Sequence, residues 1–245
     1  MLFPEPMHLT RRIDDPISGS SVTLDEYCAG NRIVTVRGRK VAITDYEKQQ
    51  LTEIDHDAAT YSITRFDEIA RLQSKRLPRV IAQKATTPME PRSLGVRASA
   101  SGRSLDTFEV RAESLADKPT LQIGVDRSVT MSRDALDALL GAGYPNERSW
   151  QHDAITRAAA PAQARMQAAT DAVSKKPVYA LPADQSMTWQ IDGRELTLRN
   201  AIIAVDNRPP PAALLLIPRG AKQVESHAVT TQRLLKELDL VKPGN

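Results

Sequence analysis

The sequence is poor in the residues that cross-link chains, stack on bases or span membranes. Among its 245 residues there is one cysteine, Cys28, which excludes an internal disulfide and a zinc site made of cysteines alone. Aromatic residues make up 4% of the chain, and no run approaches the roughly 20 apolar residues that a membrane helix needs. Because 41% of the residues are hydrophobic and 26% charged, we expect a folded globule.

The chain also has no large excess of charge of one sign, because it contains 33 basic and 30 acidic residues. Residues 65–103 are the exception, with nine basic and three acidic residues, a net charge of 9 − 3 = +6. This stretch is interpreted either as a solvated helix followed by a mobile loop or as a patch for anionic lipid headgroups or an acidic partner. We expect no nucleic-acid partner, because Phe66 alone interrupts the basic run and no stacking platform accompanies it.

The first residues of the chain have no basic region and no apolar core of the kind that a secretory signal carries. The protein is therefore expected to be cytoplasmic, or periplasmic or outer-membrane associated if a signal peptide has been removed. A single cysteine fits both compartments.

Residues 7–64 predict short strands joined by turns, in the spacing of an antiparallel meander. Met7, Leu9 and Ile13 share one face of the first strand, and Val41 and Ile43 share one face of the fourth. The predicted strands are 7–13, 21–28, 32–37, 40–46, 49–54 and 59–63.

Helical spacing marks the middle of the chain. One helix is predicted over 64–77, a second short one begins after Ser132, and the longest, over 149–175, is kinked at Pro161. The stretch 85–104 is rich in Pro, Gly, Ser and Ala and is interpreted as a flexible loop.

A second set of strands follows, with Phe108, Val110, Met187, Trp189 and Ile191 predicted to point inward. The strands are expected at 105–113, 119–126, 187–191, 195–205 and 212–217, with a hairpin turn at Asp192-Gly193 and a terminal helix over 234–241. About ten strands in two sets, separated by helices that cannot form alternating βαβ units, predict an α+β fold with one large curved antiparallel sheet.

No motif declares a reaction, and we predict that the protein is not an enzyme and binds neither a metal nor a cofactor. Cys28 is interpreted as a small buried hydrophobe. Asp55-His56-Asp57 is interpreted as a polar hairpin turn, because three adjacent strand residues cannot face one ion. Asp25 and Glu26 are adjacent on a strand and point to opposite faces, which argues against shared acid–base work.

Three segments resemble LolA-like proteins, the bacterial lipoprotein carriers and their envelope relatives. The first two run from Tyr27 to Ile33 (YCAGNRI) and from Ile43 to Tyr61, which includes ITDYEK and LTEIDHDAATY. The third, PAALLLIPRGAKQV, covers 211–224. The similarity extends over residues 20–64 and 187–224.

The resemblance implies an incomplete β-barrel in which helices cover the concave side of the sheet. It implies a single domain over 1–245, with a helical and loop insert at about 65–104 and 131–176. The expected function is a non-enzymatic carrier or binder of a hydrophobic ligand, such as a lipid, an acyl chain or a lipoprotein, in the bacterial cell envelope. A membrane or an envelope protein is then the expected partner.

An apolar concave face is penalised by water and needs a cover, which can be a ligand or the protein's own side chains. Trp189 can therefore be core or pocket lining, and an interaction module with a filled sheet is the alternative function. The residues predicted to bind the ligand are Ile33, Val41, Ile43, Phe108, Val110, Met187, Trp189, Ile191 and Leu198.

Overall fold

The chain forms two successive sets of strands. In the computed structural model, residues 1–74, 90–99, 101–112, 119–141, 150–161, 178–191, 193–226 and 230 are described. The first set comprises β1 (Phe3–Asp15), β2 (Ser20–Gly30), β3 (Arg32–Arg37), β4 (Lys40–Asp45), β5 (Gln50–Asp55) and β6 (Thr60–Arg65). The second set comprises β7 (Arg92–Ala98), β8 (Ser104–Arg111), β9 (Thr120–Met131), β10 (Tyr179–Ile191) and β11 (Arg194–Asp206).

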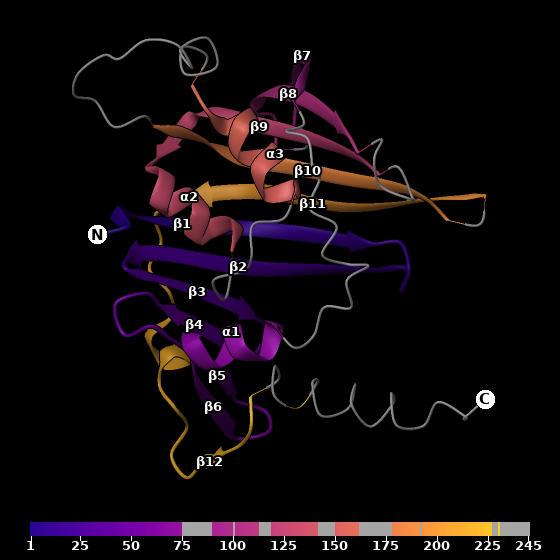
Figure 1. Cartoon of the computed structure of the whole chain (residues 1–245). Helices are drawn as coiled ribbons and strands as arrows, with labels where there is room; N and C mark the ends of the chain where they lie inside the picture. Colours follow the sequence, from indigo (N-terminus) through magenta and orange to yellow (C-terminus); the bar gives the residue numbers. More distant parts are fainter. Residues whose placement is uncertain are drawn as a thin grey trace, which may run out of the picture.

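Both sets belong to one open sheet (Figure 1). Its order is β12-β6-β5-β4-β3-β2-β1-β11-β10-β9-β8-β7, where β12 (Lys222–Gln223) is a short strand near the end of the described chain. Neighbours are antiparallel except β12 and β6, which are parallel. The prediction of an α+β fold built on a large, mostly antiparallel sheet is confirmed.

Tight turns connect the strands as the sequence predicts. Arg37 pairs with Lys40 across a turn that contains Gly38, and Ile191 pairs with Arg194 across a turn that contains Gly193. Both glycines have positive φ angles, of 60° and 73°, which residues with a Cβ rarely adopt. Glycine at these positions therefore sets the register of the two hairpins.

The two sets of strands meet in the middle of the sheet, where β1 pairs with β11. Leu9 lies opposite Val205, and the register shifts between Thr10 and Arg11. The first strand of the chain is thus held by one of the last. The sheet is continuous only because residues nearly 200 positions apart pair with each other.

Three helices pack on the same face of this sheet, which we call the helical face. The helices are α1 (Phe66–Ser74), α2 (Arg133–Leu140) and α3 (Trp150–Ala159). Leu136 and Leu139 of α2 belong to a buried cluster with Leu9 and Ile33. The other two helices bury Ile69 against Leu51 and Ile155 against Phe108. Figure 1 shows all three helices on the near side of the strands.

The opposite face of the first set is covered by a segment without α-helices or long strands. Residues 207–226, here called the strap, leave β11 and contain the 3-10 helix η1 (Ala212–Leu215). Leu214 and Leu215 pack against a buried cluster on β3, β4 and β5 that includes Val34, Val41 and Ile54. The strap then reaches the far edge of the sheet, where β12 pairs with β6.

Two predictions of secondary structure are wrong. The segment 85–104 contains the edge strand β7, whose residues are all exposed although Leu94 and Val96 alternate with Gly95 and Arg97. Residues 212–217, predicted as a strand, form η1 and an exposed turn. Prolines on both sides of this run remove the N–H donors that a strand would need, so it is held by side-chain packing instead.

Some predicted elements lie outside the described residues. These are the part of the longest helix beyond Pro161 and the terminal helix at 234–241. The described part of that longest helix, α3, ends at Ala159, two residues before Pro161. Among the described helices, none has the length and apolar character needed to cross a bilayer.

Candidate functional site

The residues predicted to bind a ligand do not share one surface. Val41 and Ile43 pack with the cluster under the strap, on the face opposite the helices. The side chain of Ile191 lies outside the described part of the chain. The register of the strands places the remaining predicted residues on the helical face, and these are Ile33, Phe108, Val110, Met187, Trp189 and Leu198.

Most of these positions on the helical face are covered by the protein's own helices. Phe108 and Val110 are buried in one cluster with Ala154 and Ile155 of α3, and Met187 packs against that cluster. Trp189 and Leu198 lie further along the β10–β11 hairpin and are half-buried. Side chains therefore fill the space at Phe108 and Val110, where a ligand was expected.

A cavity of about 250 Å³ lies beside these packed regions, between α2 and the strands on which the two sets meet. We call it the Arg11 cleft. The wall formed by α2 is apolar and consists of Leu139 and Leu140, and Ile13, Leu24 and Pro182 add apolar surface on the strands. The remaining lining is polar and consists of Arg11, Glu26, Thr35, Gln185 and Asn200.

A buried ion pair forms the polar part of the cleft. The Nε and Nη2 atoms of Arg11 donate to Oε2 of Glu26 at 2.9 and 2.7 Å, and Nη1 donates to Oδ1 of Asn200 at 3.0 Å. The side chains of Arg11 and Glu26 are 9% and 4% exposed. Such a pair is stable only when the two charges compensate each other closely, because water no longer solvates them.

The sequence contained a signal for this pair. Arg11 falls in phase with Leu9 and Ile13 on the first strand, and Glu26 falls in phase with Leu24 on the second. Opposite charges on the buried faces of neighbouring strands indicate a paired polar site. The inward face of the first strand was predicted from its apolar residues alone, so Arg11 was not included among the candidate site residues.

A second and larger cavity, of about 550 Å³, adjoins the first set of strands and shares Thr35 with the Arg11 cleft. Its lining includes Arg37, Lys40, Glu53 and Asp55 from the strands, and Val224 from the strap. Lys40 Nζ lies 3.1 Å from Asp55 Oδ2. Apolar residues such as Val41 and Ile54 also line this cavity, so it combines charged and apolar surface without the buried ion pair of the Arg11 cleft.

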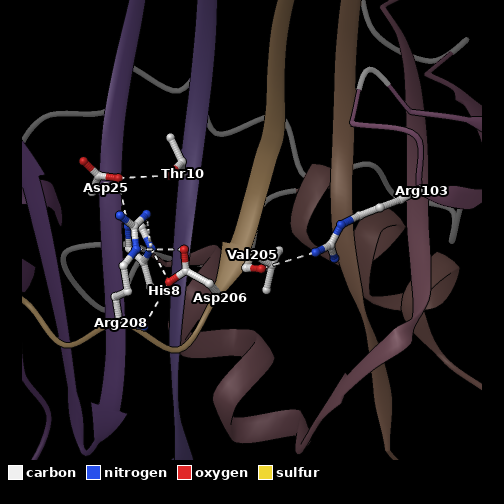
Figure 2. A network of polar contacts seen from close by, with 7 residues as sticks. All are labelled: His8, Thr10, Asp25, Arg103, Val205, Asp206 and Arg208. Carbon is white, nitrogen blue, oxygen red and sulfur yellow. Dashed lines mark hydrogen bonds and ion pairs between the residues drawn. The ribbon is translucent and has the colours of Figure 1, made fainter.

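A polar network occupies the other face of the sheet, where β2, β1 and β11 run side by side (Figure 2). His8 is 1% exposed, and its Nε2 lies 2.8 Å from Asp25 Oδ1 while its Nδ1 lies 2.9 Å from Asp206 Oδ1. Thr10 donates to the same oxygen of Asp25 at 3.0 Å, and Tyr27 stacks on the imidazole at 4.4 Å. The network therefore connects three neighbouring strands.

The geometry of His8 favours a structural role over proton transfer. Both ring nitrogens are engaged by carboxylates of the protein, which leaves neither nitrogen free for a substrate. The backbone N–H of Arg208, together with the side chain of His8, lowers the pKa of Asp206. The charge of Asp206 is thus favoured at the point where the strap begins.

The remaining candidate residues take the roles that the sequence predicts for them. Asp55 Oδ1 accepts the backbone N–H groups of Asp57 and Ala58, which closes a polar hairpin turn. Cys28 is 1% exposed, and burial raises the pKa of its thiol to about 12. Asp25 and Glu26 point to opposite faces, toward His8 and Arg11 respectively. No three metal-binding side chains gather among the described residues.

Comparisons with known proteins do not identify a family. No family model and no curated protein matches the chain. Among solved structures, one described as PNGF-II in C2 space group aligns at a TM-score of 0.38 with 7% sequence identity. The alignment covers 95% of this chain and 33% of that one, so the chain spans about a third of its length.

Proposed function

We propose that this protein is a non-catalytic binder of an amphiphilic ligand, which it holds in the Arg11 cleft. The observation that carries the proposal is that the cleft has an apolar side, formed by α2, and a buried ion pair on the strands. Ligand sites typically combine apolar lining with a few convergent polar groups that orient the ligand. At about 250 Å³, the cleft accommodates a short chain or one end of a longer one.

The position of the cleft supports the same proposal. Leu139 and Leu140, at the end of α2, form part of its apolar wall. A helix of eight residues can shift by small amounts on a sheet, which would admit an apolar chain. The ion pair is fixed instead on β1 and β2, in the centre of the sheet.

The resemblance to LolA-like proteins extends the proposal to a LolA-like half-barrel that carries lipid or lipoprotein in the bacterial envelope. An open sheet with helices on one face is compatible with such a fold. In that case the ligand passes between the cleft and a membrane or an envelope protein. The site differs from the one expected, because it lies on β1, β2 and β11 and not at Phe108 and Val110.

Native mass spectrometry of the purified protein tests the proposal without assuming a particular ligand. We expect adducts of amphiphile mass on the wild-type protein. Leu24→Trp places an indole in the cleft and should remove them. Val22→Trp, on the same face of β2 but outside the cleft lining, is the matched control and should keep them. A bare wild-type spectrum, or equal adducts on both variants, would contradict the proposal.

An interaction module is the second candidate, and the filled positions on the helical face favour it. Phe108 and Val110 are covered by α3, so this part of the sheet needs no ligand to exclude water. In that case Leu24→Trp and Val22→Trp should both leave binding of a protein partner intact, and neither protein should carry a small-molecule adduct. Size-exclusion chromatography of the complex distinguishes this outcome from loss of a ligand.

A further inference from the structure

The charges that line the Arg11 cleft cancel. Among the described residues, Arg11 and Glu26 are the only charged ones that line it, and they contact each other at 2.7 Å. The other polar lining residues, Thr35, Gln185 and Asn200, are neutral. From the described part of the chain, a ligand that enters the cleft therefore meets paired charges and neutral dipoles and no free charge of either sign.

This neutrality selects against a charged headgroup. A carboxylate would leave its water shell and then approach Glu26 as closely as it approaches Arg11. An ammonium group would meet the same balance with the signs reversed. In a partly buried site the lost hydration is not repaid without an uncompensated charge of opposite sign.

Hydrogen-bonding capacity remains at the ion pair, however. The contacts with Glu26 and Asn200 use three N–H groups of Arg11, and a guanidinium group has five. Glu26 accepts both hydrogen bonds from Arg11 through Oε2, and Oε1 accepts none from the described residues. The amide of Gln185 adds a donor and an acceptor. The site can thus donate to and accept from one ligand group at the same time.

We infer that the ligand of the Arg11 cleft carries an uncharged headgroup that both donates and accepts hydrogen bonds, as the glycerol end of a monoacylglycerol does. The chain lies against Leu24, Leu139 and Leu140, and the hydroxyl groups face Arg11 and Glu26. The pair thereby acts as a specificity device that excludes fatty acids and cationic amphiphiles of the same chain length. This inference rests on the proposed function and adds the chemical class of the ligand.

Calorimetric titration of the delipidated wild-type protein at about pH 8 provides the first test, because decanoate is ionised there. The probes are 1-decanoylglycerol, decanoate and decyltrimethylammonium, which share one chain. We expect 1-decanoylglycerol to bind at least about tenfold more tightly than either ion. If decanoate binds as tightly, the headgroup inference fails and the proposed function stands. If none of the three binds, both fail.

Two isosteric substitutions test the role of the ion pair in opposite directions. Glu26→Gln leaves Arg11 uncompensated and should strengthen decanoate binding by about tenfold relative to 1-decanoylglycerol. Asn200→Asp adds a negative charge beside Arg11 and should weaken decanoate and strengthen decyltrimethylammonium. Glu195→Gln is the matched control, because it is the same substitution at an exposed position of the β10–β11 hairpin. It should leave the order of affinities for the three probes unchanged.

If Glu26→Gln does not fold, Asn200→Asp still provides the test, because it removes no partner of the buried guanidinium group of Arg11. Thermal unfolding of each variant, measured without ligand, identifies a folding defect separately. An unchanged ranking of the three probes in a folded Asn200→Asp protein would overturn the role of the pair in selecting the headgroup.

Discussion

At the scale of single residues, Cys28 shows how the sheet controls reactivity. Its thiol is buried among the residues between the helices and the strands, and desolvation by burial raises its pKa to about 12 from 9.0. The nearby carboxylate of Glu26 acts in the same direction. A thiol in this environment stays protonated at neutral pH, and the thiolate is the form that reacts.

We expect Cys28 to be inert toward a thiol reagent in the folded protein and to react fully in denaturant.

The raised pKa of Cys28 also predicts how the stability of the protein changes at alkaline pH. Above pH 9.0 the thiol ionises in the unfolded chain first, so the stability of the folded state falls as the pH rises toward about 12. Cys28→Ala should reduce this alkaline loss, as measured by denaturant unfolding across that range. Rapid labelling under native conditions would show that the thiol is accessible.

Residue types also explain why the binding positions could not be assigned to a face from the sequence. Ile33 and Val34 are neighbours on one strand, and both are buried, at 1% and 6% exposure. The helices cover the first and the strap covers the second. When both faces of a strand are buried, alternation carries no information about which face is the inner one. Val41 and Ile43 were therefore grouped with residues that lie on the other side.

At the scale of elements, α2 links stability to the proposed site. Ser132 precedes the helix, and its hydroxyl oxygen accepts the backbone N–H of Ala135 at 3.1 Å, as the sequence predicts for a capping residue. The opposite end of the same helix supplies Leu139 and Leu140 to the cleft. Weakening the first turn of α2 should therefore loosen the apolar wall of the Arg11 cleft.

Ser132→Ala is expected to lower the free energy of unfolding by about 1 kcal/mol, because one N–H at the helix start loses its acceptor. Ser132→Asp keeps an accepting oxygen at this position and should stay close to the wild type. Denaturant unfolding gives the stability, and the fraction of ligand adducts in native mass spectra reports on the cleft. Equal stability of the alanine and aspartate variants would show that the cap is unimportant.

The elements that the sequence predicts well are those in which one local rule applies. The hairpins at Gly38 and Gly193 have turn residues that fix the register, so β3, β4 and the β10–β11 hairpin were placed correctly. The edge strand β7 and the strap were missed because their structure depends on distant partners. The surrounding Pro, Gly, Ser and Ala residues of 85–104 hid the short alternation of Leu94 and Val96, and η1 is defined by the surface it covers.

At the scale of the whole molecule, the His8 network lies where the two sets of strands join. His8 of β1 contacts Asp25 of β2 and Asp206 of β11, and Arg103, just before β8, donates to the carbonyl oxygen of Val205 at 3.5 Å. Figure 2 shows His8, Asp25 and Asp206 on three adjacent strands and the side chain of Arg103 pointing toward Val205. The same sheet carries the Arg11 cleft on its other face, so the network also supports the proposed site.

Replacing His8 by Leu should lower the free energy of unfolding by about 1–3 kcal/mol, since a buried group with two charge-assisted hydrogen bonds is lost. The loss should concentrate at the junction. Hydrogen exchange measured by mass spectrometry should show β1 and β11 losing protection more than β4 and β5. Thr10→Val, which removes one neighbouring bond to Asp25, serves as the mild control. A uniform loss over all strands would contradict a local role for the network.

The strap has a consequence for how the chain is made. Leu214, whose carbonyl oxygen lies 3.0 Å from His56 Nε2, comes 158 positions later in the chain. A ribosome synthesises the chain from its N-terminus, so β3, β4 and β5 leave it long before the residues that shield them. Until then, their apolar surface at Val34, Val41 and Ile54 is open to other chains. The interval of synthesis between these strands and the strap is therefore the period in which the nascent protein is most exposed to aggregation, and the one in which a chaperone has a surface to hold.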